Sequence, residues 1–202
     1  MEISDTYFTI SSASPEVLFK DKNSKFFGYA FPFTSDQEVK LIIENLKKKH
    51  FSARHFCYAY QTGTEKIQYR TNDDGEPNNS AGMPIYGQIQ SFSLTNILIV
   101  VVRYFGGVKL GVGGLSAAYK TTAQMAIEAS EIIEKTINVH FTIKFDYKNM
   151  NKIMRIIKEK SIIIASQRMT ETCKMEIVTR KKNAKNIFDI FNDIFEVEIE
   201  EI

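Results

Sequence analysis

The stretch that decides the fold runs from Ile97 to Leu115 and reads ILIVVVRYFGGVKLGVGGL. Its first six residues are an unbroken aliphatic run rich in β-branched side chains, which is typical of a buried strand. Five of the chain's ten glycines follow within residues 106–114, and glycine weakens regular structure unless the backbone needs a positive φ or a close approach. The segment 115–133, rich in alanine and methionine, predicts a helix. We therefore expect a strand, a glycine-rich turn and a helix.

Outward toward the N-terminus, the pattern predicts a mixed sheet with helices. Apolar residues recur at helical spacing after Ser35 and Asp36, from Val39 to Leu46, which indicates an amphipathic helix with a polar cap. Aromatic and β-branched segments between polar turns indicate strands. The expected strands cover residues 7–10, 26–33, 56–60 and 67–69.

Toward the C-terminus, the pattern of apolar and polar residues changes at Ile137. Apolar and polar residues alternate strictly from Val139 to Tyr147, as in a strand with one buried face. The expected elements after it are a helix at 150–157, strands at 162–169 and 173–179, a helix at 187–194 and a strand at 195–199. The order βαββαβ is the ferredoxin-like pattern. We predict an α+β protein of two domains, residues 1–135 and 136–202.

Composition limits the functional classes. The 202 residues are 44% hydrophobic and 25% charged with a net charge of +2, so net charge alone does not indicate nucleic-acid or membrane binding. Cys57 and Cys173 are isolated, which argues against a disulfide framework or a zinc site. The longest aliphatic run has six residues and acids lie near the start, so neither a signal peptide nor a membrane span is expected. We expect a cytoplasmic protein without membrane association.

Charge is nevertheless uneven in the second domain. Residues 144–185 contain twelve Lys or Arg and four acids, whereas residues 186–202 contain six acids and no base. A basic sheet face could meet phosphate groups, although a merely solvated surface explains the same charges. The nucleic-acid-binding candidates are Lys144, Lys174, Arg180, Lys181, Lys182 and Lys185.

A strand, a glycine-rich turn and a helix also suggest an anion site at the helix N-terminus. The standard nucleotide motifs fail, because the sole lysine of the turn lies in its middle and Ser116 occupies a position where a dinucleotide fingerprint has glycine. The candidates for anion or ligand binding are Arg54, Arg103, Tyr104, Gly106, Gly107, Lys109, Gly111, Gly113, Gly114 and Ser116.

An acidic loop, Asp73-Asp74-Gly75-Glu76-Pro77, lies upstream of this turn. Asp73, Asp74 and Glu76 could bind a metal or act as acid and base, with His55 as a proton shuttle. The same residues also suit an ordinary tight turn. We predict neither a metal nor a cofactor.

Three ordered motifs together resemble the YigZ/IMPACT family: ARHFCYAY at 53–60, NDDGEP at 72–77 with AGMP at 81–84, and VRYFGGVKLGVGGL at 102–115. The resemblance implies a first domain similar to the second domain of ribosomal protein S five. It implies a ferredoxin-like second domain similar to the last domain of elongation factor G. Both comparisons imply a role in translation, with RNA, the ribosome or a protein of the translation machinery as partner. One departure is Ala117, where the family usually has arginine.

Three functional hypotheses follow. The favoured one is a non-catalytic, translation-linked regulator that binds RNA or the ribosome. The alternative is a hydrolase or transferase, which requires the side chains of Arg54, His55, Asp74, Glu76 and Arg103 to converge on one pocket. The third is a protein-interaction module anchored by Tyr58, Tyr60, Tyr104 and Phe105, of which Phe105 is the better candidate for the core. The sequence does not determine the oligomeric state.

Overall fold

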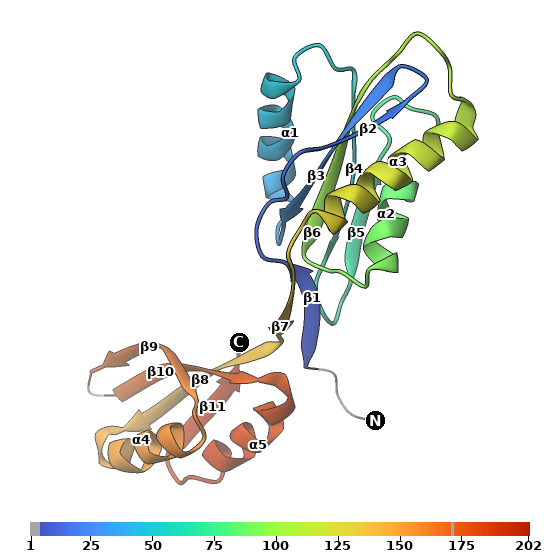
Figure 1. Cartoon of the computed structure of the whole chain (residues 1–202). Coiled ribbons are helices and arrows are strands. Elements are labelled where there is room, and N and C mark those ends of the chain that lie inside the picture. Colours follow the sequence, from blue (N-terminus) through green and yellow to red (C-terminus); the bar gives the residue numbers. More distant parts are fainter. Residues whose placement is uncertain (1–4, 171) are drawn as a thin grey trace. The chain divides into compact units, whose positions relative to one another are not determined.

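The computed structural model describes residues 5–170 and 172–202 and divides them into two compact units. The larger unit spans Tyr7–Lys135, and the smaller one contains residues 136–202 together with Asp5 and Thr6. Five α-helices and three sheets make up the described chain (Figure 1). The expected mixed fold class with α-helices and β-sheets is confirmed.

The larger unit is built on an antiparallel five-stranded sheet in the order β2-β3-β6-β4-β5. Its central strand is β6, which contains the aliphatic run at residues 97–102. A separate two-stranded sheet pairs β1 (Thr6–Ile10) with β7 (Ile132–Thr136). The five strands are β2 (Val17–Asp21), β3 (Ser24–Pro32), β4 (His55–Thr62), β5 (Gln68–Asn72) and β6 (Ile97–Tyr104).

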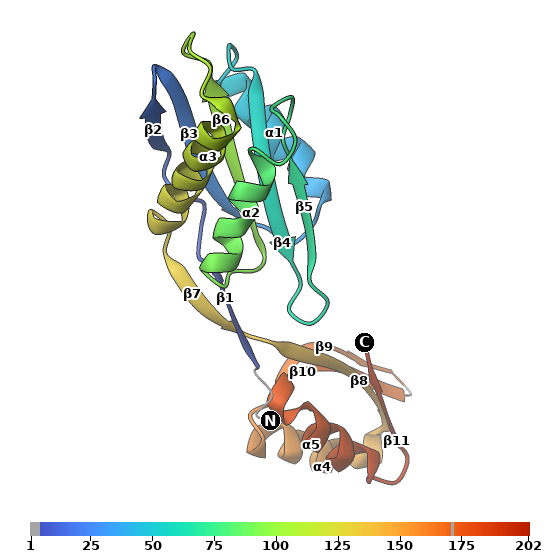
Figure 2. The same ribbon diagram turned by 90° about the vertical axis from the view of Figure 1, so that its right-hand side faces the viewer.

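Helices cover both faces of this sheet (Figure 2). The helix α1 (Gln37–Lys49) packs on one face, and α2 (Gly82–Ser91) and α3 (Gly111–Glu128) pack on the other. Strand alternation explains why β6 is apolar throughout, because Val100 and its alternate neighbours join the core under α1 while Ile99 and its neighbours join the core under α2 and α3. The sheet therefore separates two apolar cores.

The helix after the glycine-rich turn differs from the expected 115–133. It begins earlier, at Gly111, and it ends at Glu128, after which Ile132 and Ile133 belong to β7. β-Branched residues such as Ile132 and Ile133 fit a pleated strand well, and both lie in β7, which pairs with β1. The pattern also missed α2, because its Gly82, Pro84 and Gly87 have low helix propensity; proline is tolerated in a first turn.

The smaller unit has a four-stranded sheet in the order β11-β8-β10-β9, with α4 and α5 packed on one face (Figure 1). This confirms the ferredoxin-like arrangement. Phe195 departs from the expected strand alternation: it is 84% exposed and precedes β11. The elements are β8 (Asn138–Asp146), a short 3-10 helix (Tyr147–Asn149), α4 (Met150–Glu159), β9 (Ile163–Met169), β10 (Thr172–Arg180), α5 (Lys181–Asn192) and β11 (Val197–Glu201).

Residues from opposite ends of the sequence meet inside the smaller unit. Arg180 donates two hydrogen bonds to the Asp5 carboxylate, from Nε at 2.9 Å and from Nη2 at 3.2 Å.

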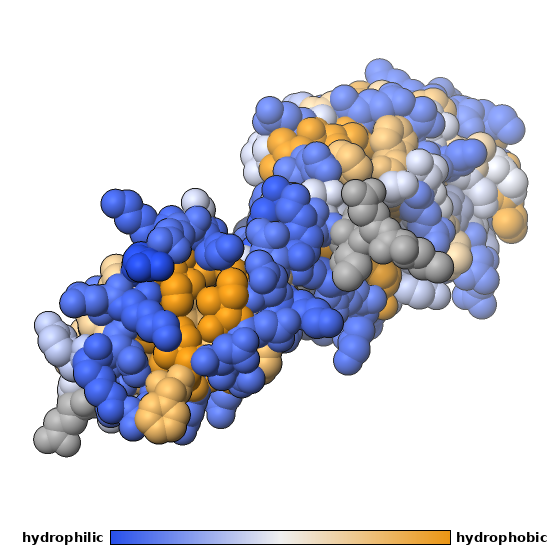
Figure 3. All heavy atoms as spheres, turned by 90° about the horizontal axis from the view of Figure 1, so that it is seen from below, coloured by the Kyte–Doolittle hydropathy of each residue, from blue (hydrophilic) through white to orange (hydrophobic). Residues whose placement is uncertain are grey.

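Figure 3 shows an apolar patch framed by polar atoms on the face of the smaller unit that it displays. Among residues 5–170 and 172–202, no helix is long and apolar enough to cross a membrane.

Candidate functional site

Asp73 of the acidic loop is an acceptor for backbone amides. Its Oδ1 accepts hydrogen bonds from the N–H groups of Ala81 at 2.9 Å and Gly82 at 2.8 Å, and its Oδ2 accepts one from Asn79 at 2.9 Å. These amides lead into α2, whose first N–H groups have no partner within the helix. A carboxylate at this end also interacts favourably with the helix dipole. Asp73 therefore holds the start of α2.

Asp74 and His55 are joined through backbone atoms. The Asp74 Oδ2 accepts a hydrogen bond of 2.7 Å from the backbone N–H of Phe56. The His55 Nδ1 lies 2.9 Å from the Asp74 carbonyl oxygen; since a carbonyl only accepts, Nδ1 is the donor of this hydrogen bond. These bonds fasten the acidic loop to the first residues of β4.

Glu76 and Arg103 form a buried ion pair under α3. The Arg103 Nη1 lies 2.7 Å from Glu76 Oε1, and each side chain is only 5% exposed. The Tyr119 hydroxyl donates a second hydrogen bond of 2.8 Å to the same oxygen, and burial raises the pKa of Tyr119, so it remains a donor. The Nε of Arg103 has no partner among the described residues. Glu76 thus neutralises a cation in the core.

The glycine-rich segment divides between a loop and the first turns of α3. Gly106 has a packing reason, because a Cβ there would overlap the backbone of Asn23 and Ser24, and Gly107 has a φ of +86°. Gly113 has neither a positive φ nor a neighbour within 4 Å of an added Cβ. Gly111 and Gly114 also lie in α3, as do the half-buried Ser116 and the exposed Ala117, whereas Lys109 is exposed in the loop. Anion binding here stays a prediction.

A hydrogen-bonded chain beside Tyr104 was not anticipated. The Tyr104 hydroxyl lies 3.0 Å from His50 Nδ1, the His50 Nε2 lies 2.5 Å from the Tyr29 hydroxyl, and Tyr29 donates to Glu16. Burial lowers the pKa of His50, which is consistent with a neutral imidazole donating from Nε2 and accepting at Nδ1. His50 carried no signal in the sequence beyond its place after a lysine-rich helix end.

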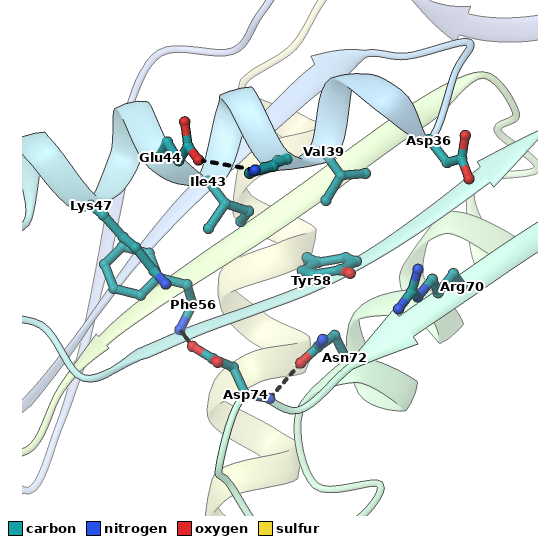
Figure 4. Close-up of a pocket in the computed structure, with 11 residues that line it drawn as sticks. Asp36, Val39, Ile43, Glu44, Lys47, Phe56, Tyr58, Arg70, Asn72 and Asp74 are labelled. Atoms are coloured by element: carbon teal, nitrogen blue, oxygen red, sulfur yellow. Dashed lines mark hydrogen bonds and ion pairs between the residues drawn. The ribbon is translucent and has the colours of Figure 1, made fainter.

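A hollow of about 440 Å³ lies between α1 and the strands β4 and β5 (Figure 4). Val39 and Ile43 of α1 and the aromatic rings of Phe56 and Tyr58 form its apolar part. Its charged and polar lining residues are Asp36, Lys40, Glu44, Lys47, Arg70, Asn72 and Asp74. Only Tyr58 and Asp74 of this set were candidates from sequence, because the rest come together through the crossing of α1 over the sheet.

A second hollow of about 260 Å³ shares Lys47, Phe56 and Asp74 with the first and adds Arg54 and the exposed Phe51. The two hollows therefore continue along the same side of α1. Volumes in this range suit small ligands or a few side chains of a partner.

The five side chains required by the enzyme hypothesis do not converge. Arg54 and Asp74 line the second hollow, on the α1 side of the sheet. Glu76 and Arg103 are paired on the opposite side, against Tyr119 of α3. His55 shares that opposite side by strand alternation. Among the described residues, no group of three His, Cys, Asp or Glu side chains could hold a metal ion.

The aromatic anchors proposed for an interaction module are mostly inside the protein. Tyr58 and Tyr60 are each 8% exposed, and Tyr104 is half-buried. The expectation for Phe105 is wrong, because its ring is exposed and lies over the Arg103 guanidinium, 5.5 Å away. β6 ends at Tyr104. Phe105 therefore lies outside the strand, whose alternate side chains are buried against the helices on its two faces.

The six basic candidates of the smaller unit do not form one patch. Lys144 and Lys174 are register partners on β8 and β10. Arg180 lies six residues beyond Lys174 on the same strand, about 20 Å away at the usual rise, and it is occupied by Asp5. Lys181, Lys182 and Lys185 lie in the first turns of α5 rather than on the sheet. The second patch that they form stays a prediction for nucleic-acid contact.

The two units and their motifs define a class of α+β protein with a ferredoxin-like second unit. A family model described as the Impact N-terminal domain matches residues 22–127. The chain is 30% identical to the IMPACT family member YvyE of Bacillus subtilis over 177 residues, covering 88% of this chain and 81% of that protein. It is 31% identical to the IMPACT family member YigZ of Escherichia coli over 150 residues, covering 73% and 74%.

The chain belongs to the IMPACT family, as its three motifs indicated. A crystal structure described as that of a hypothetical protein matches with a TM-score of 0.73. The match covers 99% of this chain and 98% of the other at 22% identity, so it supports the fold alone.

Proposed function

We propose that this protein is a non-catalytic, translation-linked regulator that contacts RNA through the open sheet face of its smaller unit. The family resemblance supports the link to translation, since it relates both domains to proteins of the ribosome and its factors. The dispersal of the five candidate catalytic side chains over two sides of the larger sheet favours binding over catalysis.

The observation that carries this proposal is a row of three cations across neighbouring strands. Lys174 on β10 is the register partner of both Arg168 on β9 and Lys144 on β8. Neighbouring strands are about 4.8 Å apart, so the three Cα atoms span about 10 Å. Residues that alternate with Lys144 and Lys174 pack under α4 and α5, so this row lies on the sheet face opposite the helices.

Like charges placed directly opposite each other destabilise a sheet. Lys144 is partly compensated by Glu198 at 3.5 Å, whereas no ion pair of Arg168 or Lys174 occurs among residues 5–170 and 172–202. An anionic partner would offset this repulsion, and the phosphate backbone of RNA is such a partner. We use the name cation row for Lys144, Arg168 and Lys174.

The test measures binding of the full chain to a fluorescein-labelled RNA hairpin and its co-sedimentation with ribosomes, over a series of salt concentrations. Replacing all three residues of the cation row by glutamine should weaken binding at least tenfold and make the slope of log affinity against log salt shallower by about 2. A separate variant with Lys181, Lys182 and Lys185 replaced tests the second basic patch.

The matched control replaces Lys152, Lys158 and Lys160, which are exposed in and just after α4, and therefore changes the net charge by the same amount. This control should retain binding. Equal weakening in both triple variants, or affinity that neither salt nor the cation-row variant alters, would contradict the proposal.

A further inference from the structure

The larger hollow of the larger unit has a length and a charge pattern of its own. One wall is formed by Asp36, the N-cap residue of α1, and by Lys40, Glu44 and Lys47 on the helix itself. Eleven residues separate the first from the last, which corresponds to about 16 Å along a helix. The facing wall is formed by β4 and by β5, an edge strand of the five-stranded sheet. The hollow is thus a trough about as long as five residues of extended chain.

Polar groups without partners lie at one end of this trough. Tyr58 is 8% exposed and lines the trough, and its hydroxyl makes no hydrogen bond to another described residue. Figure 4 shows this hydroxyl directed toward the end of the trough where Arg70 lies. The Asn72 Oδ1 accepts the N–H of Asp74 at 2.7 Å, whereas its NH₂ group has no partner in the described part of the chain. Both groups can donate a hydrogen bond, so this end of the trough can hold an acceptor group of a ligand.

The charges of the trough favour a ligand of mixed charge over a polyanion. Three cations, Lys40, Lys47 and Arg70, are balanced by three carboxylates, Asp36, Glu44 and Asp74. A nucleic-acid backbone laid along the trough would meet all three carboxylates, and like charges disfavour such a complex. A polypeptide can present both signs.

The spacing of the charges on α1 matches an extended chain. Asp36, Lys40 and Glu44 alternate in sign every four residues, which is about 6 Å along a helix. Side chains on one face of an extended segment recur every two residues, or about 6.6 Å. The Lys40–Glu44 pair, at 4.0 Å and exposed, contributes little by itself, so both side chains are available to exchange partners.

We propose that this trough binds an extended segment of a partner protein in which basic and acidic side chains alternate at every second residue. A basic side chain faces Asp36 and an acidic one faces Lys40, while a carboxylate or carbonyl oxygen accepts hydrogen bonds from Tyr58, Asn72 and Arg70. The apolar side chains Val39 and Ile43 pack against the aliphatic parts of the segment. This inference does not depend on RNA contact by the smaller unit.

The test titrates the isotope-labelled full chain with the capped peptide KVETKVE and follows the backbone amides by NMR. Saturable shifts confined to residues 36–47 and 70–74 are expected. A peptide of identical composition with its charges sorted, KKVTVEE, should bind at least fivefold more weakly. Hexauridylate should not compete for these residues.

Two variants separate the site from general effects. Tyr58→Phe removes one hydrogen bond and should weaken peptide binding about three- to tenfold, and Arg70→Gln should weaken it tenfold or more. Lys66→Gln, which removes an exposed charge between β4 and β5 outside the trough, should leave affinity unchanged. Arg70 is exposed, so its variant tests the site even if Tyr58→Phe alters folding.

Four outcomes would overturn the inference. They are absence of saturable shifts up to about 1 mM peptide, equal affinity for the two peptides, shifts that map to the smaller unit, and unchanged affinity of the Arg70→Gln variant. Displacement of the peptide by hexauridylate would replace it with a nucleic-acid site.

Discussion

Replacing Glu76 by alanine should destabilise the larger unit strongly, because it leaves the Arg103 guanidinium charged and buried without its counter-ion. The Glu76 Oε1 accepts hydrogen bonds from Arg103 at 2.7 Å and from Tyr119 at 2.8 Å, and both charged side chains are 5% exposed. Breaking a buried ion pair by removing one partner costs about 3–5 kcal/mol. The Arg103 Nε already lacks a partner among the described residues, and the other polar contact of the guanidinium is a long hydrogen bond of 3.4 Å to the uncharged Ser24 hydroxyl.

Two further variants divide this free energy into charge and packing. Glu76→Gln keeps the side-chain volume and one acceptor oxygen, and should cost less than alanine, about 1.5–3 kcal/mol, which is typical of a hydrogen bond to a charged group. The double variant Glu76→Leu with Arg103→Met removes both charges and should recover most of the loss, since apolar replacement of a buried pair is often neutral.

The assay is urea-induced unfolding followed by far-ultraviolet circular dichroism, with the free energy of unfolding extrapolated to zero denaturant. The chain contains no tryptophan, so tyrosine fluorescence supplies a second probe, and coincidence of both transitions checks whether two-state analysis applies. A loss below about 1 kcal/mol for Glu76→Ala would refute the reasoning, because it would mean that water reaches Arg103. Loss of a measurable activity without loss of stability would instead revive the catalytic alternative.

Two other perturbations have a sign that the structure determines. Burial lowers the pKa of His50, so below about pH 6.5 the unfolded chain binds a proton at this residue that the folded chain excludes. The free energy of unfolding should therefore fall as the pH drops from 7 to 5, by at most about 1.4 kcal/mol per pH unit. Urea titrations of the His50→Gln variant should show a weaker dependence on pH. Gly113→Ala should stabilise α3 by about 0.5–1 kcal/mol, whereas Gly106→Ala should destabilise the protein because its Cβ overlaps the backbone of Asn23. The thermal midpoints of the two variants distinguish these outcomes. A destabilised Gly113→Ala variant would show that the free protein itself requires this glycine.

The parts of the fold that could be predicted are those in which a single pattern has a single explanation. Strict alternation from Val139 to Tyr147 predicts a half-buried strand, and β8 lies there up to Asp146, whereas Tyr147 begins the 3-10 helix and is exposed. The aliphatic run of β6 is equally direct, because both of its faces are covered. In contrast, α2 depends on Asp73 for its N-terminal hydrogen bonds and on burial of Ile85 and Ile89 for its stability, and neither is a local property of its sequence.

For the candidate site, too, the sequence indicated some residues and could not indicate others. Motifs identified Asp73, Asp74, Glu76 and Arg103 as special residues, but the same residue types serve catalysis, capping and buried ion pairs, and only the contacts distinguish these roles. The trough beside α1 has no sequence signature, since it arises where one face of a helix meets an edge strand more than twenty residues away. The cation row likewise required the register that places Arg168 beside Lys174.

The double hydrogen bond between Arg180 and Asp5 has a consequence for synthesis of the chain. Arg180 is synthesised 175 residues after Asp5. At typical elongation rates this interval is roughly 10 to 35 s. Throughout that time Asp5 is without Arg180, so this contact of the smaller unit can form only after the segment that carries Arg180 has been made.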